Sequence, residues 1–434
     1  MADRYWIETL GCPKNQVDSD KLVGTLVADG LEAAGSAGDA DVVVVNTCAF
    51  VEAARQESVD TVLALSEARR PGARLVVTGC LAERYGADLA DALPEVDQVA
   101  GFGVPIVLGA RPGDGGASTA TEAAATDLAR LDLLNLPRPR PSAPWAYVKV
   151  AEGCDRKCGF CAIPSFRGTQ RSRPAEAVLA EVEGLGVTEV VLVAQDLASY
   201  GRDIGRPGAI LDLVRQVSAL VPRVRLLYLY PSELNDGLID TICATGVAYF
   251  DLSLQHVSRP LLRRMRRWGD GERFGERLET IRRRQPDAAF RSSFIVGYPG
   301  ETEDDHDKLL SFLAEAQLDW AGFFPFSREE GTYAAGLDGA VDPDLVGERL
   351  RELGELQDAI TASRRAALVG QSIEVLVDEE GVGRSHREAP EIDGIVVLPP
   401  SVPVGSLATV TVTGAAGPDL EACPELPPSD AEGR

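Results

Sequence analysis

Short apolar runs rich in β-branched residues alternate with amphipathic segments along most of this chain, and this alternation limits its fold more than any other feature. In the middle of the chain, six runs are typical of strands: residues 146–150, 189–194, 225–230, 250–254, 290–296 and 320–326. Helical patterns separate them, for example over residues 174–185, 210–220 and 304–316. Repeated strand–helix units of about 35–40 residues predict a parallel barrel, and six units instead of eight would leave it open on one side. We therefore expect an open (βα)6 partial TIM barrel over residues 145–365.

The N-terminal part of the chain shows the same alternation on a smaller scale. Strand-like runs at 5–9, 42–46 and 75–78 predict a doubly wound α/β domain over residues 1–110. Residues 111–144 differ, because Gly, Ala, Ser and Thr dominate 113–126 and proline recurs through 136–144. Such a composition offers little apolar surface to bury and is typical of a linker.

The C-terminal part predicts a third module. A helical pattern over 342–368 leads into short strand-like runs at 372–377, 394–398 and 408–412, separated by Gly and Pro turns. This arrangement is typical of a small antiparallel β-barrel of OB-like type, which we place at residues 366–425. We expect residues 426–434 to form a disordered tail.

Charge and cysteine content narrow the classes of partner. The 43 basic and 67 acidic side chains give a net charge of −24, which argues against a general nucleic-acid binder and against anionic membranes. No stretch is apolar enough to span a membrane, and the first residues lack an export signal, so we expect a cytoplasmic protein. In that reducing compartment, eight cysteines are more often metal ligands or catalysts than disulfides.

Three cysteines follow the first expected barrel strand in the pattern Cys-x-x-x-Cys-x-x-Cys, at Cys154, Cys158 and Cys161. Three thiolates on one short loop can bind three irons of a 4Fe–4S cube and leave the fourth iron free for another ligand. Zinc is the rival metal, but a closed zinc site needs a fourth ligand, and the only histidines are at 256, 306 and 386. The loop also lies at the C-terminal mouth of the barrel, where active sites of such barrels assemble.

A second set of cysteines repeats one placement. Cys12, Cys48 and Cys80 each come one to three residues after a strand of the expected N-terminal sheet. The carboxyl ends of neighbouring parallel strands lie on one edge of the sheet, so the three thiols are expected to converge and hold a second three-thiolate cluster. The alternative is that they are three separate small buried residues. Cys243 and Cys423 have no partner in motif spacing, and we interpret them as structural or incidental.

The 154–161 motif, with Phe160 before its last cysteine, resembles the radical S-adenosylmethionine superfamily. That resemblance implies that the free iron binds S-adenosylmethionine and that one electron cleaves it to a 5′-deoxyadenosyl radical. Phe160 is equally explained by loop packing. The two cysteine triads followed by a small β-barrel resemble the methylthiotransferases over essentially the whole chain, which implies two 4Fe–4S clusters, the second of them supplying sulfur. The closing barrel then resembles a TRAM domain, which implies substrate binding.

Two stretches resemble the branch of that family that modifies a ribosomal protein: residues 11–20, beginning Gly-Cys-Pro-Lys-Asn, and residues 328–332, Arg-Glu-Glu-Gly-Thr. The resemblance implies methylthiolation of an aspartate β-carbon in small-subunit ribosomal protein S-twelve, free or in the ribosome, with electrons from a flavodoxin- or ferredoxin-like donor. The alternatives are a methylthiotransferase acting on tRNA adenosine, whose branch typically has Gln-Met-Asn after the first cysteine, and a non-catalytic ribosome-binding protein with structural iron.

Polar residues at the ends of the later barrel strands are placed to contact S-adenosylmethionine. They are Gln195, Asp196, Ser253, Gln255 and Gly297. They are equally explained as polar residues that line a barrel rim. The turn at 297–302 resembles the family's adenine-contacting turn, although its glycines also suit a tight turn before a helix.

Two charge patterns remain. Residues 369–434 carry 12 acidic and 3 basic side chains, and no Phe, Trp or Tyr follows Tyr333. An acidic module without stacking aromatics suits a basic ribosomal protein better than RNA, so we expect no stable nucleic-acid binding. The basic run at 263–267 is interpreted as a solvated helix face, with contact to rRNA or an acidic substrate residue as the alternative.

Overall fold

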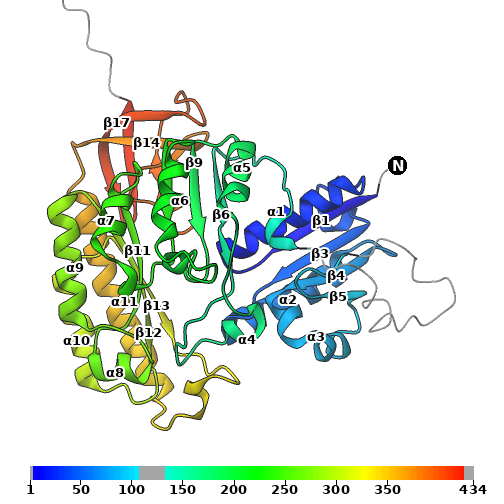
Figure 1. The fold of residues 1–434 in the computed structure, drawn as a ribbon, viewed down its shortest axis with the longest axis horizontal. Helices are drawn as coiled ribbons and strands as arrows, with labels where there is room; N and C mark the ends of the chain where they lie inside the picture. The colour runs from blue at the N-terminus through cyan, green and yellow to red at the C-terminus, as the bar shows by residue number, and fades with distance from the viewer. Residues whose placement is uncertain (1–2, 107–131, 425–434) are drawn as a thin grey trace, which may run out of the picture.

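The computed structural model describes residues 3–106 and 132–424 and contains three modules (Figure 1). The expected low-complexity segment at 113–126 and the tail at 426–434 lie outside these residues. The N-terminal module is a parallel five-stranded sheet in the order β2-β1-β3-β4-β5, with helices between the strands. Its elements are β1 (Arg4–Thr9), α1 (Pro13–Ala28), β2 (Glu32–Ala33), β3 (Val42–Thr47), α2 (Glu52–Ala68), β4 (Arg74–Gly79), α3 (Cys80–Ala92) and β5 (Gln98–Ala100), with a 3-10 turn at Ala37–Asp39.

The central module has six parallel strands in two hydrogen-bonded sheets, β6-β9-β10 and β11-β12-β13. A single bridge between Leu229 and Leu252 joins the sheets into one open barrel. The strands are β6 (Trp145–Lys149), β9 (Glu189–Val193), β10 (Arg223–Leu226), β11 (Tyr249–Gln255), β12 (Ala289–Val296) and β13 (Trp320–Pro325). The helices are α4 (Ile163–Arg167), α5 (Ala175–Leu185), α6 (Ala209–Ser218), α7 (Asp236–Cys243), α8 (Arg259–Arg264), α9 (Gly271–Arg284), α10 (Glu303–Ala316) and α11 (Pro343–Ala366); a small ribbon pairs β7 (Ala151–Glu152) with β8 (Arg171–Ser172).

The open six-stranded barrel is confirmed, but its third strand differs from the expected run at 225–230. Strand β10 begins two residues earlier and ends at Leu226, because Tyr228 adopts a left-handed backbone with φ +64°. A non-glycine residue in that region interrupts regular pairing. The chain nevertheless continues across the barrel mouth, where cations lie over the rings of Tyr228 and Tyr230.

The C-terminal module is a closed five-stranded barrel, β14-β15-β16-β18-β17, so the expected β-barrel is confirmed. Its strands are β14 (Ser372–Glu379), β15 (Val382–Arg384), β16 (Val396–Val397), β17 (Leu407–Ala416) and β18 (Asp419–Pro424). The sequence pattern missed β15 and β18. All pairs are antiparallel except β16 with β18, which pair in parallel.

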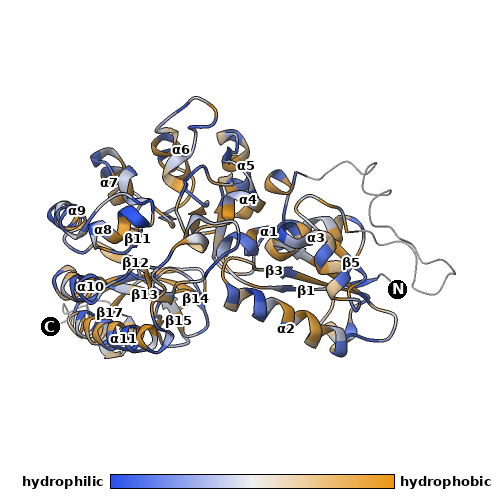
Figure 2. Cartoon of the chain, turned by 90° about the horizontal axis from the view of Figure 1, so that it is seen from below, coloured by the Kyte–Doolittle hydropathy of each residue, from blue (hydrophilic) through white to orange (hydrophobic). Residues whose placement is uncertain are grey.

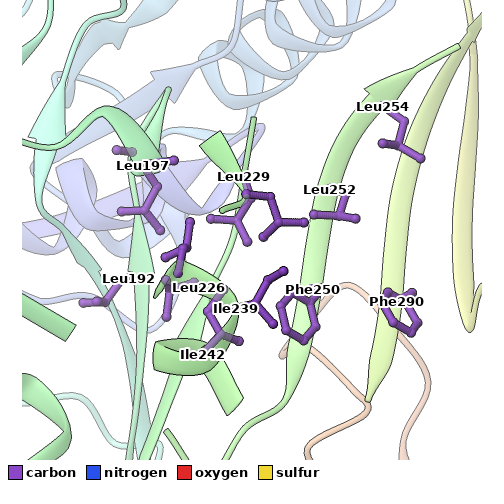
Figure 3. Close-up of a cluster of buried hydrophobic side chains, with 14 of the residues drawn as sticks. Leu192, Leu197, Leu226, Leu229, Ile239, Ile242, Phe250, Leu252, Leu254 and Phe290 are labelled. Atoms are coloured by element: carbon purple, nitrogen blue, oxygen red, sulfur yellow. The ribbon is translucent and has the colours of Figure 1, made fainter. Parts of the chain in front are cut away.

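Two layers of apolar side chains fill the central module. The outer layer lies between the strands and the helices, and Figure 3 shows part of it around Leu192, Leu226, Ile239 and Phe250. Figure 2 colours the chain by hydropathy and shows that α9, on the outside of the barrel, is largely hydrophilic. The inner layer fills the barrel interior with residues from all six strands or their ends, among them Tyr147, Val191 and Tyr249. Val17 of α1 and Ala389 of the C-terminal module belong to the same inner cluster, so the two flanking modules close the barrel from opposite sides.

Buried ion pairs attach the C-terminal module to the end of the barrel opposite the cysteine loop. Glu189, at the start of β9, is fully buried and lies 2.8 Å from Arg225 and 3.4 Å from Arg384 of β15. Arg225 also donates to the carbonyl of His386. Burial raises the pKa of Glu189, but the combined effect of Arg384, Arg225 and Arg223 is larger and holds this pKa well below its ordinary value. The carboxylate is therefore ionised and organises this interface.

Over the described ranges 3–106 and 132–424, no helix is both long enough and apolar enough to cross a lipid bilayer.

We predict that Glu189→Gln loosens the C-terminal module, because it leaves the guanidinium groups around position 189 without their counterion. Breaking one side of such a buried pair costs about 3–5 kcal/mol. Hydrogen exchange of β14–β18 should accelerate strongly, whereas Glu183→Gln, an exposed change on the preceding helix, should leave it unchanged. Equal exchange in the two variants would contradict the role given to Glu189.

Candidate active site at the barrel mouth

The loop that carries Cys154, Cys158 and Cys161 leaves the barrel directly after β6 and β7 and is held by backbone contacts. Gly153 has φ +77°, and a β-carbon there would lie 2.1 Å from the carbonyl oxygen of Thr169, so only glycine fits before the first cysteine. The amide of Cys154 donates to the carbonyl of Gly168, at 3.1 Å. Between the second and third cysteines, Gly159 donates to the carbonyl of Met265 and accepts from the amide of Ala334.

Two arginines contact the cysteines of this loop, Arg267 through its side chain and Arg156 through its backbone amide. Arg267 donates from Nη1 to Cys158 Sγ at 3.2 Å and from Nη2 to the carbonyl of Ser253, and the Arg156 amide lies 3.4 Å from Cys154 Sγ. Both guanidinium groups also lie over the ring of Tyr230, at 4.0 Å for Arg156 and 4.3 Å for Arg267. The interpretation of 263–267 as a solvated helix face is therefore wrong for Arg267, which turns inward because the short helix α8 ends at Arg264.

The thiols of the N-terminal domain lie at one edge of its sheet, as expected. Strands β1, β3 and β4 are neighbours, and Cys12, Cys48 and Cys80 follow their carboxyl ends. A β-carbon on Gly11 would lie 3.0 Å from Cys48 Sγ, so the loop of the first cysteine touches the second. Gly79 has φ +90° and packs against the carbonyl of Thr47, which brings Cys80 beside the Cys48 loop.

Electrostatics distinguish these three thiols. Burial raises the pKa of Cys48 to about 12 and also raises that of Cys80. Burial acts on Cys12 as well, but the cations of Lys14 and Arg167 outweigh it and lower the Cys12 pKa. Cys12 also caps α1, and Cys80 is the first residue of α3, so two helix N-termini add positive potential. The position of Cys12 therefore favours anionic sulfur, whereas burial disfavours the thiolates of Cys48 and Cys80.

Arg167 connects the two cysteine sites. It lies in α4, six residues after Cys161, and its Nη2 donates to Cys80 Sγ at 3.1 Å and to Asn15 Oδ1 at 2.7 Å. Its Nη1 pairs with Glu152 at 2.7 Å. Phe166, the preceding residue, packs in the core of the N-terminal domain beside Cys80. The chain that leaves one cysteine triad is therefore anchored on the other.

A buried ionic network surrounds this connection. Lys149 of β6 pairs with Asp18 of α1 and, at 2.7 Å, with Glu152; Arg167 lies 3.4 Å from Asp18. Burial raises the pKa of Glu152, but Arg167 and Lys149 lower it well below its ordinary value. Two carboxylates thus face two cations across the junction of the N-terminal domain and the barrel.

Glu329 makes a second junction between these modules. It follows β13 within the 328–332 stretch and is 2% exposed. Its carboxylate accepts from Arg55 of α2 at 2.5 Å and from Arg84 of α3 at 2.7 Å. Nearby, the amide of Glu52 donates to Ser327 Oγ. The N-terminal domain is therefore clamped to both edges of the open barrel.

The donor sets are of the kind that iron–sulfur cubes use. Within residues 3–106 and 132–424, no three His, Cys, Asp or Glu side chains are close enough to share one ion. A cube needs a wider separation, because each thiolate binds a different iron. Each triad supplies three cysteines and has a guanidinium donor on one sulfur, at Cys80 and at Cys158. Such donors orient and stabilise cluster thiolates.

The end of β9 presents two acceptors without donors. Gln195 Nε2 donates to Glu152, but its Oε1 is buried and unsatisfied. Asp196 Oδ2 accepts from Arg156 at 2.6 Å and from Ser199, whereas its Oδ1 is buried and unsatisfied. Buried acceptors normally have donors, so these two oxygens suit the amino or hydroxyl groups of S-adenosylmethionine.

The other expected contacts for S-adenosylmethionine are less open. Gln255 ends β11 with φ +69°, a strained backbone typical of functional sites, and the carbonyl of Ser253 is occupied by Arg267. The amide of Gly297 donates to Glu301 Oε2 at 2.6 Å, so it is engaged within its own turn. Phe160 packs partly buried against the main core. A ligand role for these four residues stays a prediction.

Sequence reasoning missed the residues that join the two sites, namely Lys14, Lys149, Glu152, Arg167, Arg267 and Glu329. Arg267 and Glu329 lay in stretches already noted for charge and resemblance. For Lys149 and Glu152, charged residues at the end of an apolar strand were an available signal. No local pattern pointed to Arg167, because its partners in the N-terminal domain, Cys80 and Asn15, are 87 and 152 residues away.

Three family models match the three modules. The family described as Uncharacterized protein family UPF0004 matches residues 4–101, the Radical SAM superfamily matches residues 148–313, and the TRAM domain matches residues 369–424.

Curated relatives match almost the whole chain. A protein of Kineococcus radiotolerans named Ribosomal protein uS12 methylthiotransferase RimO is 44% identical, with 96% of each chain covered. Proteins of the same name from Salinispora arenicola and Cutibacterium acnes are 42% and 40% identical and cover 97% and 96% of this chain. Among solved structures, the radical S-adenosylmethionine methyltransferase TsrM from Kitasatospora setae has a similar fold, with a TM-score of 0.51 at 14% identity over 74% of this chain and 73% of its own.

We predict that Arg167→Lys lowers the iron retained by the N-terminal triad. A lysine keeps the charge but cannot contact Cys80, Asn15 and Glu152 together, because it lacks the planar fork of arginine. The measurement is iron content after anaerobic reconstitution, in a background with Cys154, Cys158 and Cys161 replaced by alanine. The matched control is Arg171→Lys. Arg171 follows Arg167 by four residues and forms an exposed ion pair with Asp132. Equal iron in both variants would show that Arg167 is dispensable for the site.

Proposed function

The chain belongs to the family of ribosomal protein uS12 methylthiotransferases, and from that membership we propose which residues carry the reaction and where the substrate lies. It is a radical S-adenosylmethionine methylthiotransferase with a TRAM domain, and ribosomal protein uS12 is its substrate. The observation that carries the proposal is the position of Arg167. This residue lies six positions after Cys161 of the barrel triad, and its Nη2 lies 3.1 Å from Cys80 Sγ of the other triad.

Cys154, Cys158 and Cys161 hold a 4Fe–4S cluster that binds S-adenosylmethionine. When bound, these groups supply the electron and the radical that make an unactivated C–H bond reactive. The surrounding residues orient and shield them: Arg267 supports Cys158, and the unsatisfied oxygens of Gln195 and Asp196 receive donors from S-adenosylmethionine. Closing the barrel with the N-terminal domain keeps water from this space.

Cys12, Cys48 and Cys80 hold the second 4Fe–4S cluster, which presents the sulfur to be transferred. Lys14, Arg167 and the helix N-termini give this edge the positive potential that anionic sulfur requires. The ionic network of Asp18, Lys149 and Glu152 fixes its position relative to the barrel mouth. The substrate carbon is then held between a radical source on one side and a sulfur source on the other.

The substrate group is the β-carbon of an aspartate in uS12, a basic ribosomal protein. The acidic C-terminal module favours such a partner over RNA, although part of its acidity has another use. Asp378 pairs with Arg384, and Glu388 pairs with Arg365. Within residues 369–424 the exposed carboxylates are Glu374, Glu379, Glu380, Glu391 and Glu421, and these remain for the substrate. A flavodoxin- or ferredoxin-like protein supplies the electrons.

Deleting the gene should remove one methylthio group from uS12. Mass spectrometry of uS12 from the deletion strain should show the unmodified aspartate, and complementation should restore the modification. Nucleoside analysis of tRNA from the same strain should be unchanged. A normal uS12 mass together with loss of a methylthio-adenosine would overturn the substrate assignment.

Anaerobically reconstituted protein should contain about eight irons and eight sulfides, as two cubes require. Cys154→Ala should retain about half and should produce no 5′-deoxyadenosine from S-adenosylmethionine under reducing conditions. Cys423→Ala, which changes an exposed cysteine outside both triads, should retain the full content. A wild-type content near four would refute the second cluster.

A further inference from the structure

Lys14 is a largely buried lysine with no carboxylate partner among the described residues. The chain has five lysines. Lys21 donates to the carbonyls of Leu134 and Leu136 and pairs with Glu181; Lys149 pairs with Asp18 and Glu152. Lys308 pairs with Asp304, and Lys157 is exposed. Lys14 is 8% exposed, yet within residues 3–106 and 132–424 no oxygen or nitrogen accepts a hydrogen bond from its ammonium group.

The ammonium of Lys14 lies at the barrel mouth. Its Nζ is 3.3 Å from the centroid of the Tyr228 ring, where the chain leaves β10 in the left-handed backbone region. Two residues farther along, the ring of Tyr230 lies under the guanidinium groups of Arg156, within the barrel cysteine loop, and Arg267, which donates to Cys158 of that loop. Two residues of extended chain span only about 7 Å. Lys14 follows Cys12 by two positions, so its charge lies between the two cysteine sites.

The neighbouring carboxylates are already engaged. Asp18 and Glu152 pair with Lys149 and Arg167. Asp251, the other carboxylate that acts on Lys14, accepts from the Tyr228 amide at 2.9 Å and from Arg291 at 3.1 Å. The ammonium of Lys14 therefore has the Tyr228 ring and the nearby Cys12 sulfur as neighbours, but no free carboxylate among the described residues, and a buried ammonium is costly unless an anion pairs with it. The place therefore selects an anionic ligand.

We propose that Lys14 binds the side-chain carboxylate of the uS12 aspartate and holds its β-carbon between the two cysteine sites. This inference rests on the proposed function, because it takes the aspartate as the group to be modified. The carboxylate accepts a charge-assisted hydrogen bond from the Lys14 ammonium, which donates none within the described residues. A neutral nucleobase supplies no negative charge to pair with the ammonium, so Lys14 favours the protein substrate.

The same ammonium could instead contact the sulfur of a cluster held by Cys12. The two roles predict different dependences of the Lys14→Met effect. A contact with the substrate makes the effect of Lys14 depend on the charge of the target aspartate, whereas a contact with the cluster changes iron content or the cluster spectrum regardless of substrate. A double-mutant cycle separates them.

The experiment measures binding of uS12 to reconstituted enzyme with S-adenosylmethionine, without turnover. It combines wild-type enzyme or Lys14→Met with wild-type uS12 or uS12 in which the target aspartate is asparagine. Lys14→Met should weaken binding of wild-type uS12 about tenfold or more, and should hardly change binding of the asparagine form. Lys14→Arg should recover part of the affinity. Lys308→Met, which removes an exposed lysine on α10, should bind both forms like wild type.

Iron content and the visible spectrum of each variant show whether the sites remain loaded. Equal weakening for both forms of uS12, or no weakening, would overturn the inference, as would a loss of iron in Lys14→Met with no dependence on the aspartate. If wild-type enzyme failed to modify uS12 at all, the proposed function itself would fail. Modification by wild-type enzyme together with zero coupling would reject only the role of Lys14.

Discussion

The buried ionic network of Asp18, Lys149, Glu152 and Arg167 is the interaction on which the site depends. Its members come from the first helix of the N-terminal domain, the first barrel strand, the ribbon after it and the helix after the cysteine loop. Carboxylates and cations buried together must remain paired, because an unpaired charge in the interior is strongly destabilising. The network therefore allows one relative placement of the two modules, and with it one separation of the two cysteine triads.

The opposite end of the barrel uses the same chemistry for another purpose. Glu189, with Arg225 and Arg384, attaches the C-terminal barrel beneath the strands, while Ala389 reaches the apolar interior. The acidity of this module is consequently divided between attachment and surface. Asp378 and Glu388 are paired with arginines, and among residues 369–424 the exposed glutamates remain to act on a basic substrate. The net charge of this module therefore overstates the negative charge that is exposed to a partner.

The parts predicted correctly are those that depend on local pattern. Strand periodicity predicted the open barrel, and the placement of Cys12, Cys48 and Cys80 after successive strands predicted their common edge, since parallel neighbours end together. The prediction for 263–267 failed for Arg267, because the short helix α8 ends at Arg264 and the chain beyond it turns Arg267 toward Cys158. The missed strands β15 and β18 are respectively short and adjacent to the chain end, so their patterns were weak.

The sequence by itself determined the three modules, the two cysteine triads and the branch of the family, because each is written in spacing between neighbouring residues. Only the tertiary structure decided that Arg167 reaches Cys80, that Glu329 holds the N-terminal domain, and that Lys14 is buried at the barrel mouth with no carboxylate partner among the described residues. Glu329 and Arg55 are 274 residues apart in the chain. No local periodicity encodes such contacts, since they arise only when packing of separate modules excludes water and leaves each charge to find a partner.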